Sequence, residues 1–123
     1  MAASPLHSID SLKNELALIS GMSKIENLIL LSEAYRNVNY DDCIDYGMIA
    51  IDESRLLHDE ILEAKSLKSL GISAYLVGNF DKSISFFERS LELYSLKEYY
   101  EGMSGCYNNI GLIYEEKADF NKA

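Results

Sequence analysis

The sequence predicts an all-α fold, a right-handed solenoid built from a row of antiparallel helix pairs. Three observations predict it: a single proline in 123 residues, an apolar content of 48%, and side chains that recur at an interval of 40 residues. Long stretches rich in Leu, Ile, Glu, Lys, Ser and Ala favour helices over strands. A short helical unit cannot bury its apolar face alone, so repeated units must stack on their neighbours.

The recurrence is clearest when residues 30–44 are aligned with residues 70–84. Leu, Ala, Tyr, Asn, Asp and Ile coincide in the two segments, and aromatic residues stand at positions 40, 80 and 120. We therefore expect an N-terminal segment with a leading helix at 1–22 and an array at 23–123. The repeats of the array are expected at about 24–63, 64–103 and 104–123, the last one incomplete.

Capping and breaker residues predict the individual helices. The leading helix spans about 8–20 and stops at Gly21, and Ser23 with Glu26 forms a capping box that opens a helix ending near Asn37. Later helices are expected at 41–55, 58–77, 81–96 and 98–117. The next helix of the third unit would begin near Phe120, so we expect the chain to be a fragment of a longer array.

Small residues are expected where the two helices of a pair cross, because a short interaxial distance leaves no room for large side chains. Cys43 and Ala50 have this role in unit one, and Ser83 and Ser90 have it in unit two. Aromatic residues would fill the adjoining gaps. The packing signature of small and aromatic residues is Gly71, Phe80, Phe87, Gly111, Tyr114 and Phe120.

Composition excludes several classes of function. The net charge of −9 argues against nucleic acid and against an anionic membrane surface, because both require clustered basic residues. No apolar run is long enough to span a bilayer, and the N-terminus lacks a signal-peptide pattern. Cytoplasm and periplasm both stay open as compartments, depending on the parent protein.

Catalytic chemistry is not predicted either. No histidine stands at a motif spacing from a nucleophile, and the acidic pairs are sequence neighbours that point to different sides of a helix. Cys43 and Cys106 have neither metal-ligand nor disulfide spacing. We expect a non-enzyme with no cofactor and no metal site.

The motifs resemble those of the tetratricopeptide repeat family over residues 24–123. The segment Leu67-x2-Leu70-Gly71-x3-Tyr75 and the segment Tyr107-x2-Ile110-Gly111-x2-Tyr114 are similar to the first-helix pattern of that family. Three features depart from it: the interval is 40 rather than 34, the closing proline is absent, and Leu31 replaces the small residue in unit one. Longer helices would account for the first two departures.

The resemblance implies a concave groove, lined by the first helices of successive pairs, that holds an extended peptide. Within it, Asn109 matches a position that commonly binds the ligand backbone, and Lys65 with Lys68 would receive a carboxylate or an acidic side chain. Unit one lacks the Lys and Asn of chaperone-binding members. The alternative for both lysines is an ordinary solvated helix face, and for the Asn108–Asn109 pair a contact between helices. The implied groove residues are Ile25, Leu28, Ile29, Ser32, Tyr35, Lys65, Lys68, Ser69, Ile72, Tyr75, Asn108, Asn109, Leu112 and Glu115.

The expected function is protein or peptide binding within a larger signalling protein. The chain resembles the repeat regions of bacterial sensor histidine kinases, and also those of peptide-responsive transcriptional regulators and phosphatases. A self-assembling scaffold is a further alternative, because a third unit without its second helix leaves Tyr107, Ile110 and Tyr114 uncovered. That alternative predicts a homo-oligomer formed through the C-terminal end.

Overall fold

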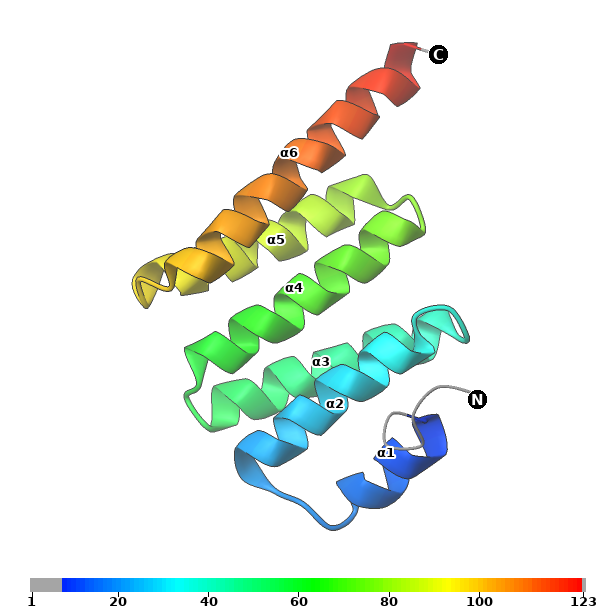
Figure 1. Ribbon diagram of the computed structural model, residues 1–123, viewed down its shortest axis with the longest axis vertical. Coiled ribbons are helices and arrows are strands. Elements are labelled where there is room, and N and C mark those ends of the chain that lie inside the picture. The colour runs from blue at the N-terminus through cyan, green and yellow to red at the C-terminus, as the bar shows by residue number, and fades with distance from the viewer. Residues whose placement is uncertain (1–7, 123) are drawn as a thin grey trace.

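The protein is all-α, as expected. The computed structural model describes residues 8–122, with side chains up to Asp119, and these residues contain six helices and no strand (Figure 1). Proline occurs only at position 5, outside the described residues. The helices are α1 (Ile9–Leu16), α2 (Gly21–Tyr35), α3 (Tyr40–Leu56), α4 (Glu60–Leu76), α5 (Phe80–Leu96) and α6 (Tyr100–Lys122).

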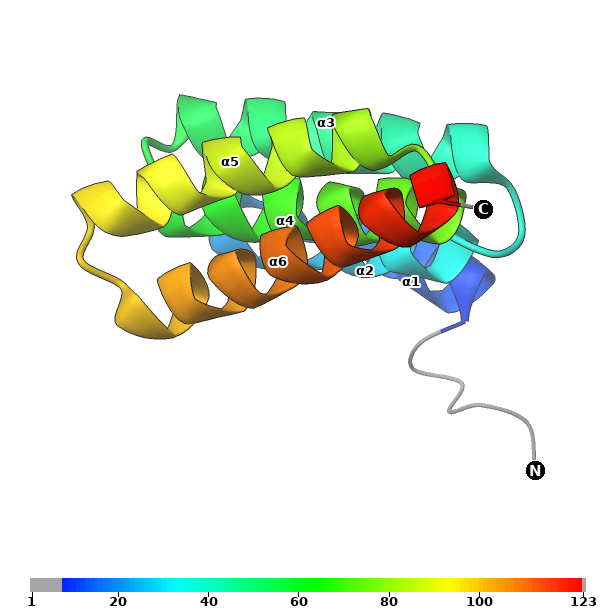
Figure 2. The ribbon, with the colours of Figure 1, turned by 90° about the horizontal axis from the view of Figure 1, so that it is seen from above.

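The helices form two layers. Figure 2 shows α3 and α5 side by side in one layer, with α2, α4 and α6 in the other. Each helix packs on the next one along the chain, and α2 also touches α4. The first helices of the first two expected pairs, α2 and α4, therefore lie next to one another.

The turns explain why the interval is regular. Helices α3, α4 and α5 each contain 17 residues, and three-residue turns follow them. The middle turn residues, His58, Gly78 and Glu98, take the left-handed conformation with φ of 55°, 79° and 54°. The next amide in each turn bonds the carbonyl five residues earlier, at 2.9 Å in all three cases. This pattern closes a helix end with a Schellman motif, so the 40-residue interval contains two equal halves of 20 residues.

Small residues lie at the helix crossings, as expected. Cys43, Ala50, Ser83 and Ser90 are all fully buried. The buried hydroxyls are used across the crossings: Ser83 Oγ donates to the Gly71 carbonyl at 2.6 Å, and Ser90 Oγ donates to the Ala64 carbonyl at 2.7 Å. A buried hydroxyl without such a partner would destabilise the fold by about 1–3 kcal/mol.

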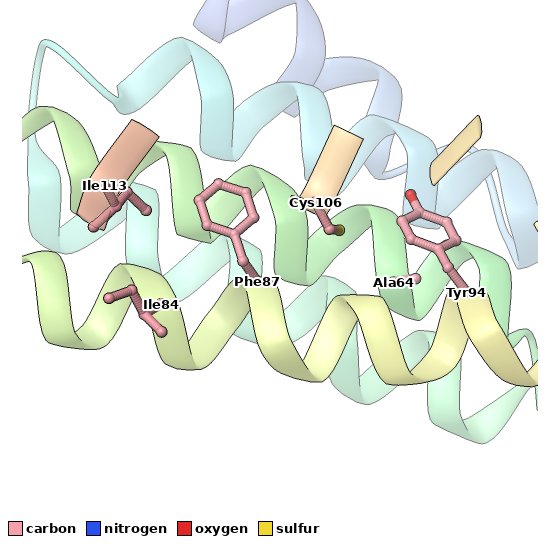
Figure 3. Close-up of a cluster of buried hydrophobic side chains, with 6 residues drawn as sticks. All are labelled: Ala64, Ile84, Phe87, Tyr94, Cys106 and Ile113. Atoms are coloured by element: carbon pink, nitrogen blue, oxygen red, sulfur yellow. The ribbon is translucent and has the colours of Figure 1, made fainter. Parts of the chain in front are cut away.

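Phe87 lies against Gly71 in the largest buried cluster. A Cβ placed on Gly71 would lie 3.0–3.1 Å from three atoms of the Phe87 ring, which leaves no comfortable room for a side chain. Figure 3 shows this cluster filling the space between α4, α5 and α6. Gly71 and Phe87 thus have the packing role that the sequence predicts for them.

The beginning of the chain differs from the prediction. Helix α1 ends at Leu16, and Gly21 is the first residue of α2 instead of a stop for α1. Within α1 only Leu12 is buried, and Leu18 is 85% exposed, so a longer helix would have nothing to pack against. The proposed capping box is wrong as well: Ser20 is the N-cap of α2, and Ser23 lies inside the first turn.

The end of the described chain differs too. Helix α6 continues to Lys122 without the turn expected before Phe120, whose side chain lies outside the described residues. In the α4–α5 turn Gly78 supplies the left-handed conformation, whereas the position 40 residues later is Ala118. Alanine pays a steric penalty in that conformation, as His58 and Glu98 do in the other two turns, and at Ala118 the helix continues instead.

Gly111 and Tyr114 do not pack as expected. No atom lies within 4 Å of a Cβ placed on Gly111, and Tyr114 is 54% exposed. Helix α6 buries Gly102, Cys106 and Ile113 against α5 instead. The face that carries Gly111 corresponds to the face of α4 that α5 covers, and no described helix covers it in α6.

Candidate ligand-binding groove

A hollow opens in the layer formed by α2, α4 and α6. It has a volume of about 560 Å³, and we call it the central hollow. Five of the predicted groove residues line it: Ile29, Lys65, Lys68, Ser69 and Ile72. The remaining lining residues are Glu26, Leu30, Glu33, Leu62, Tyr94, Tyr99, Glu101 and Gly102.

Lys65 and Lys68 reach this hollow because α4 is buried on its other sides. Leu67 and Leu70, next to them in sequence, are fully buried, so the two lysines occupy the one strip of α4 that remains open. Neither lysine forms an ion pair with any residue in the part of the chain that the structure describes. The Lys68 side chain lies over Gly105, where a Cβ would be 3.3 Å from Nζ. The half-buried ammonium group of Lys68 therefore has space around it and no carboxylate beside it.

Three carboxylates also line the central hollow, and the sequence interpretation missed all of them. Glu26 and Glu33 come from α2, and Glu101 comes from the first turn of α6. Their spacing in the sequence does not distinguish these three glutamates from other exposed glutamates. Only the fold brings them to the hollow. The hollow thus presents positive charge from α4 and negative charge from the two helices that flank it.

Ser69 lines the hollow, but its polar groups are already engaged. Arg36 Nη2 donates to the Ser69 carbonyl at 3.2 Å and to Ser69 Oγ at 3.3 Å, while Arg36 Nε donates to Ser73 Oγ at 2.8 Å. Ser69 Oγ donates to Glu33 at 3.5 Å. These bonds join α2 to α4 and keep the side of the hollow in place. Ser69 also accepts a hydrogen bond from Ser73 Oγ within α4, at 3.1 Å, through its carbonyl.

A second hollow of about 210 Å³ adjoins the first at Ile72, and we call it the apolar hollow. Four predicted groove residues line it, Ile72 and Tyr75 from α4 and Asn109 and Leu112 from α6. Its other lining residues are Leu76, Phe87 and Ile113. Asn109 is the only residue among them that carries an amide side chain, and this amide can both donate and accept a hydrogen bond.

Tyr75 also ties α4 to α6. Its hydroxyl donates to the Glu116 carboxylate, and this hydrogen bond raises the pKa of Tyr75 above its ordinary value. The Tyr75 ring lies 5.9 Å from that of Phe80. Tyr75 therefore forms a wall of the apolar hollow, with its hydroxyl held by Glu116 and its ring packed near Phe80.

The predicted groove surface of α2 is partly wrong. Ile25, Leu28 and Ser32 are buried in the core, because α2 turns this face toward α3 and α4. Tyr35 stacks on Tyr46 of α3, with ring centroids 5.4 Å apart. Asn108, Leu112 and Glu115 are exposed on α6, and of these only Leu112 lines a hollow.

Tyr94 is a groove residue that periodicity alone would have found. It continues the spacing of Ser83, Phe87 and Ser90 along one face of α5. The ring is 2% exposed and stacks on Tyr99 at 5.2 Å. Burial raises the pKa of Tyr94 to about 12, so its phenol stays neutral at physiological pH.

The two cysteines are buried thiols. Cys43 Sγ donates to Ser73 Oγ at 3.3 Å, and Cys106 Sγ donates to Ser90 Oγ at 3.6 Å. Burial raises the pKa of Cys106 and outweighs the opposing effect of Lys68. Among the described residues, no three His, Cys, Asp or Glu side chains gather where they could hold a metal ion. No helix in that part of the chain has the length and apolar character needed to cross a bilayer.

Comparison with protein-family models gives no match, and comparison with curated proteins gives no significant match.

Proposed function

We propose that the chain is a non-catalytic peptide-binding module of the tetratricopeptide type, a right-handed solenoid within a larger signal-transduction protein. One observation carries this proposal: two lysines that form no ion pair with any described residue lie in a hollow lined by α2, α4 and α6. The 40-residue interval and the motifs around Gly71 and Gly111 support the family. A bacterial sensor histidine kinase is the favoured parent, and a peptide-responsive transcriptional regulator or phosphatase is the alternative.

The charges around the groove favour a peptide of mixed sign. An acidic side chain or a carboxylate would approach Lys65 and Lys68, and basic side chains would approach Glu26, Glu33 or Glu101. Two ammonium groups three residues apart share one face of α4, so one carboxylate can contact both. Binding of this kind weakens as salt concentration rises.

Charge reversal at the lysines tests the proposal. Peptides selected from a random display library against the wild-type protein should bind Lys65→Glu and Lys68→Glu at least about tenfold more weakly, a change of about 1.4 kcal/mol in binding free energy. The measurement is fluorescence anisotropy with each selected peptide. Lys82→Glu is the matched control, because Lys82 is exposed on α5 in the other layer. The Lys82→Glu variant should bind each selected peptide as tightly as the wild type does.

Two results would contradict the proposal. One is a library from which the wild-type protein selects no peptide. The other is equal affinity in Lys65→Glu, Lys68→Glu and Lys82→Glu, which would place the ligand elsewhere on the molecule.

A self-assembling role is the second candidate, favoured by the uncovered face of α6. Tyr107 and Tyr114 are 60% and 54% exposed, whereas the equivalent residues of α4, Leu67 and Ala74, are fully buried. Gly111 lies between the two tyrosines on the same face, with open space above it. If two copies pack α6 against α6 in antiparallel fashion, Tyr107 of each chain lies over Gly111 of the other, as Phe87 lies over Gly71.

Sedimentation equilibrium tests this second candidate. The wild-type chain should dimerise, and Tyr107→Glu with Tyr114→Glu should make it monomeric, because buried carboxylates at the interface are strongly unfavourable. Tyr100→Glu, at an exposed position in the first turn of the same helix, should leave the dimer intact. A monomeric wild-type chain would remove this role.

A further inference from the structure

The two hollows follow one another along the crevice between α4 and α6. Lys68 of α4 lies over Gly105 of α6, the next turn contributes Ile72 and Asn109, and the turn after that contributes Tyr75 and Leu112. The hydrogen bond from Tyr75 to Glu116 continues this pairing toward the far end. At these levels α4 and α6 face one another across the hollows, and a chain that fills both hollows must run along them.

The hollows differ in chemistry. The central hollow holds two cations without ion-pair partners, whereas the apolar hollow is closed by Ile72, Phe87, Leu112 and Ile113, with one amide. The first accepts an acidic group, and the second has the volume for one large apolar side chain. Asn109 lies in the wall of the apolar hollow, where its amide can reach the backbone of a bound chain.

The spacing of the hollows can be stated from helix geometry. On α4 the apolar hollow lies at the level midway between Ile72 and Tyr75. At a rise of about 1.5 Å per residue, this level is about 8 Å beyond Lys68 along the helix axis. On α6, the level midway between Asn109 and Leu112 also lies about 8 Å beyond Gly105. In an extended peptide, side chains two positions apart share a face and are separated by about 7 Å, and those four apart by about 13 Å. Adjacent side chains, and those three positions apart, point to opposite faces.

We infer that the groove selects an extended peptide in which an acidic residue and a large apolar residue stand two positions apart. The acidic side chain binds Lys68, the apolar side chain fills the apolar hollow, and the Asn109 amide in the wall of that hollow bonds the peptide backbone. This inference rests on the proposed peptide-binding function and adds the sequence pattern that the ligand must carry. The apolar residue distinguishes this ligand from a purely acidic peptide, which would fill only the central hollow.

A series of synthetic peptides tests the spacing. Each carries one Glu and one Leu in an uncharged Gly-Ser host, with the two residues one, two, three or four positions apart and in both orders. Isothermal titration should give the tightest binding at a spacing of two, about tenfold tighter than at spacings of one and three. Leu112→Asp, at a half-exposed position that lines only the apolar hollow, should abolish the preference for Leu, while Leu96→Asp, 72% exposed at the end of α5, should not.

The outcomes separate the inference from the function on which it rests. Equal affinity at all spacings, or a preference unaffected by Leu112→Asp, overturns the inference and leaves peptide binding in place. If no synthetic peptide binds while library peptides bind through Lys68, the spacing inference is also overturned. If library peptides do not bind either, both the inference and the proposed function fail.

Discussion

Replacing Phe87 with alanine should lower the free energy of unfolding by about 3–5 kcal/mol, the usual range for a buried phenylalanine. The ring is 1% exposed and lies against Gly71, so no neighbouring side chain can move in to fill the space that the ring leaves. A domain of this size has a total stability of about 5–15 kcal/mol, and the variant should therefore lose a large part of it. Urea denaturation followed by circular dichroism measures the change.

Tyr107→Ala is the control for Phe87→Ala. Tyr107 is also a large aromatic residue, but it is 60% exposed on α6, and its removal should change the stability by no more than about 0.5 kcal/mol. The comparison must be made at a protein concentration where the chain is monomeric. A loss below about 1 kcal/mol in Phe87→Ala would mean that the cluster between α4, α5 and α6 does not hold the helices together.

Most helices of the array could be predicted because their signals are local and repeated. The bounds expected for α3, α4 and α5 agree with the structure to within two residues, since breakers and capping residues recur every 20 residues. The N-terminal helices could not be placed as well. Ser23 and Glu26 have the spacing of a capping box, yet the N-cap of α2 is Ser20, three residues earlier, and the first turn of the helix is exposed.

The candidate groove was predictable on α4 and less so on its neighbours. Lys65, Lys68, Tyr75 and Asn109 line the hollows, because the interval of 40 residues aligns α4 with α6. On α2 only Ile29 lines the hollow as predicted: Ile25 and Leu28 are core, and Glu26 and Glu33, which were not predicted, face the hollow. Only the rotation of α2 about its own axis distinguishes these two sets, and the tertiary contacts decide that rotation.

Gly102→Ala should destabilise the protein by about 1–3 kcal/mol, the second large effect that we expect. A Cβ at this position would lie 2.6–2.7 Å from three atoms of the Tyr94 ring. That ring cannot move aside, because it is 2% exposed and stacks on Tyr99. Since Gly102 lies at the edge of the central hollow, the displacement of α6 should also weaken peptide binding.

The same substitution at Gly111 should have the opposite sign. No atom lies within 4 Å of a Cβ at Gly111, so the alanine meets no steric conflict there. Alanine in a helix interior is more favourable than glycine by about 0.5–1 kcal/mol, because glycine loses more conformational freedom on folding. The two variants are chemically identical and lie in one helix, so they differ only in what surrounds the added methyl group.

The groove exists because α4, α5 and α6 nest closely through small residues, and this claim is tested most directly by urea denaturation of Gly102→Ala and Gly111→Ala side by side. We expect Gly102→Ala to be less stable than the wild type and Gly111→Ala to be more stable, with a difference of about 1.5–4 kcal/mol between them. Equal stabilities, or a stabilised Gly102→Ala, would show that α6 does not lie against Tyr94 and that the helices do not enclose the groove.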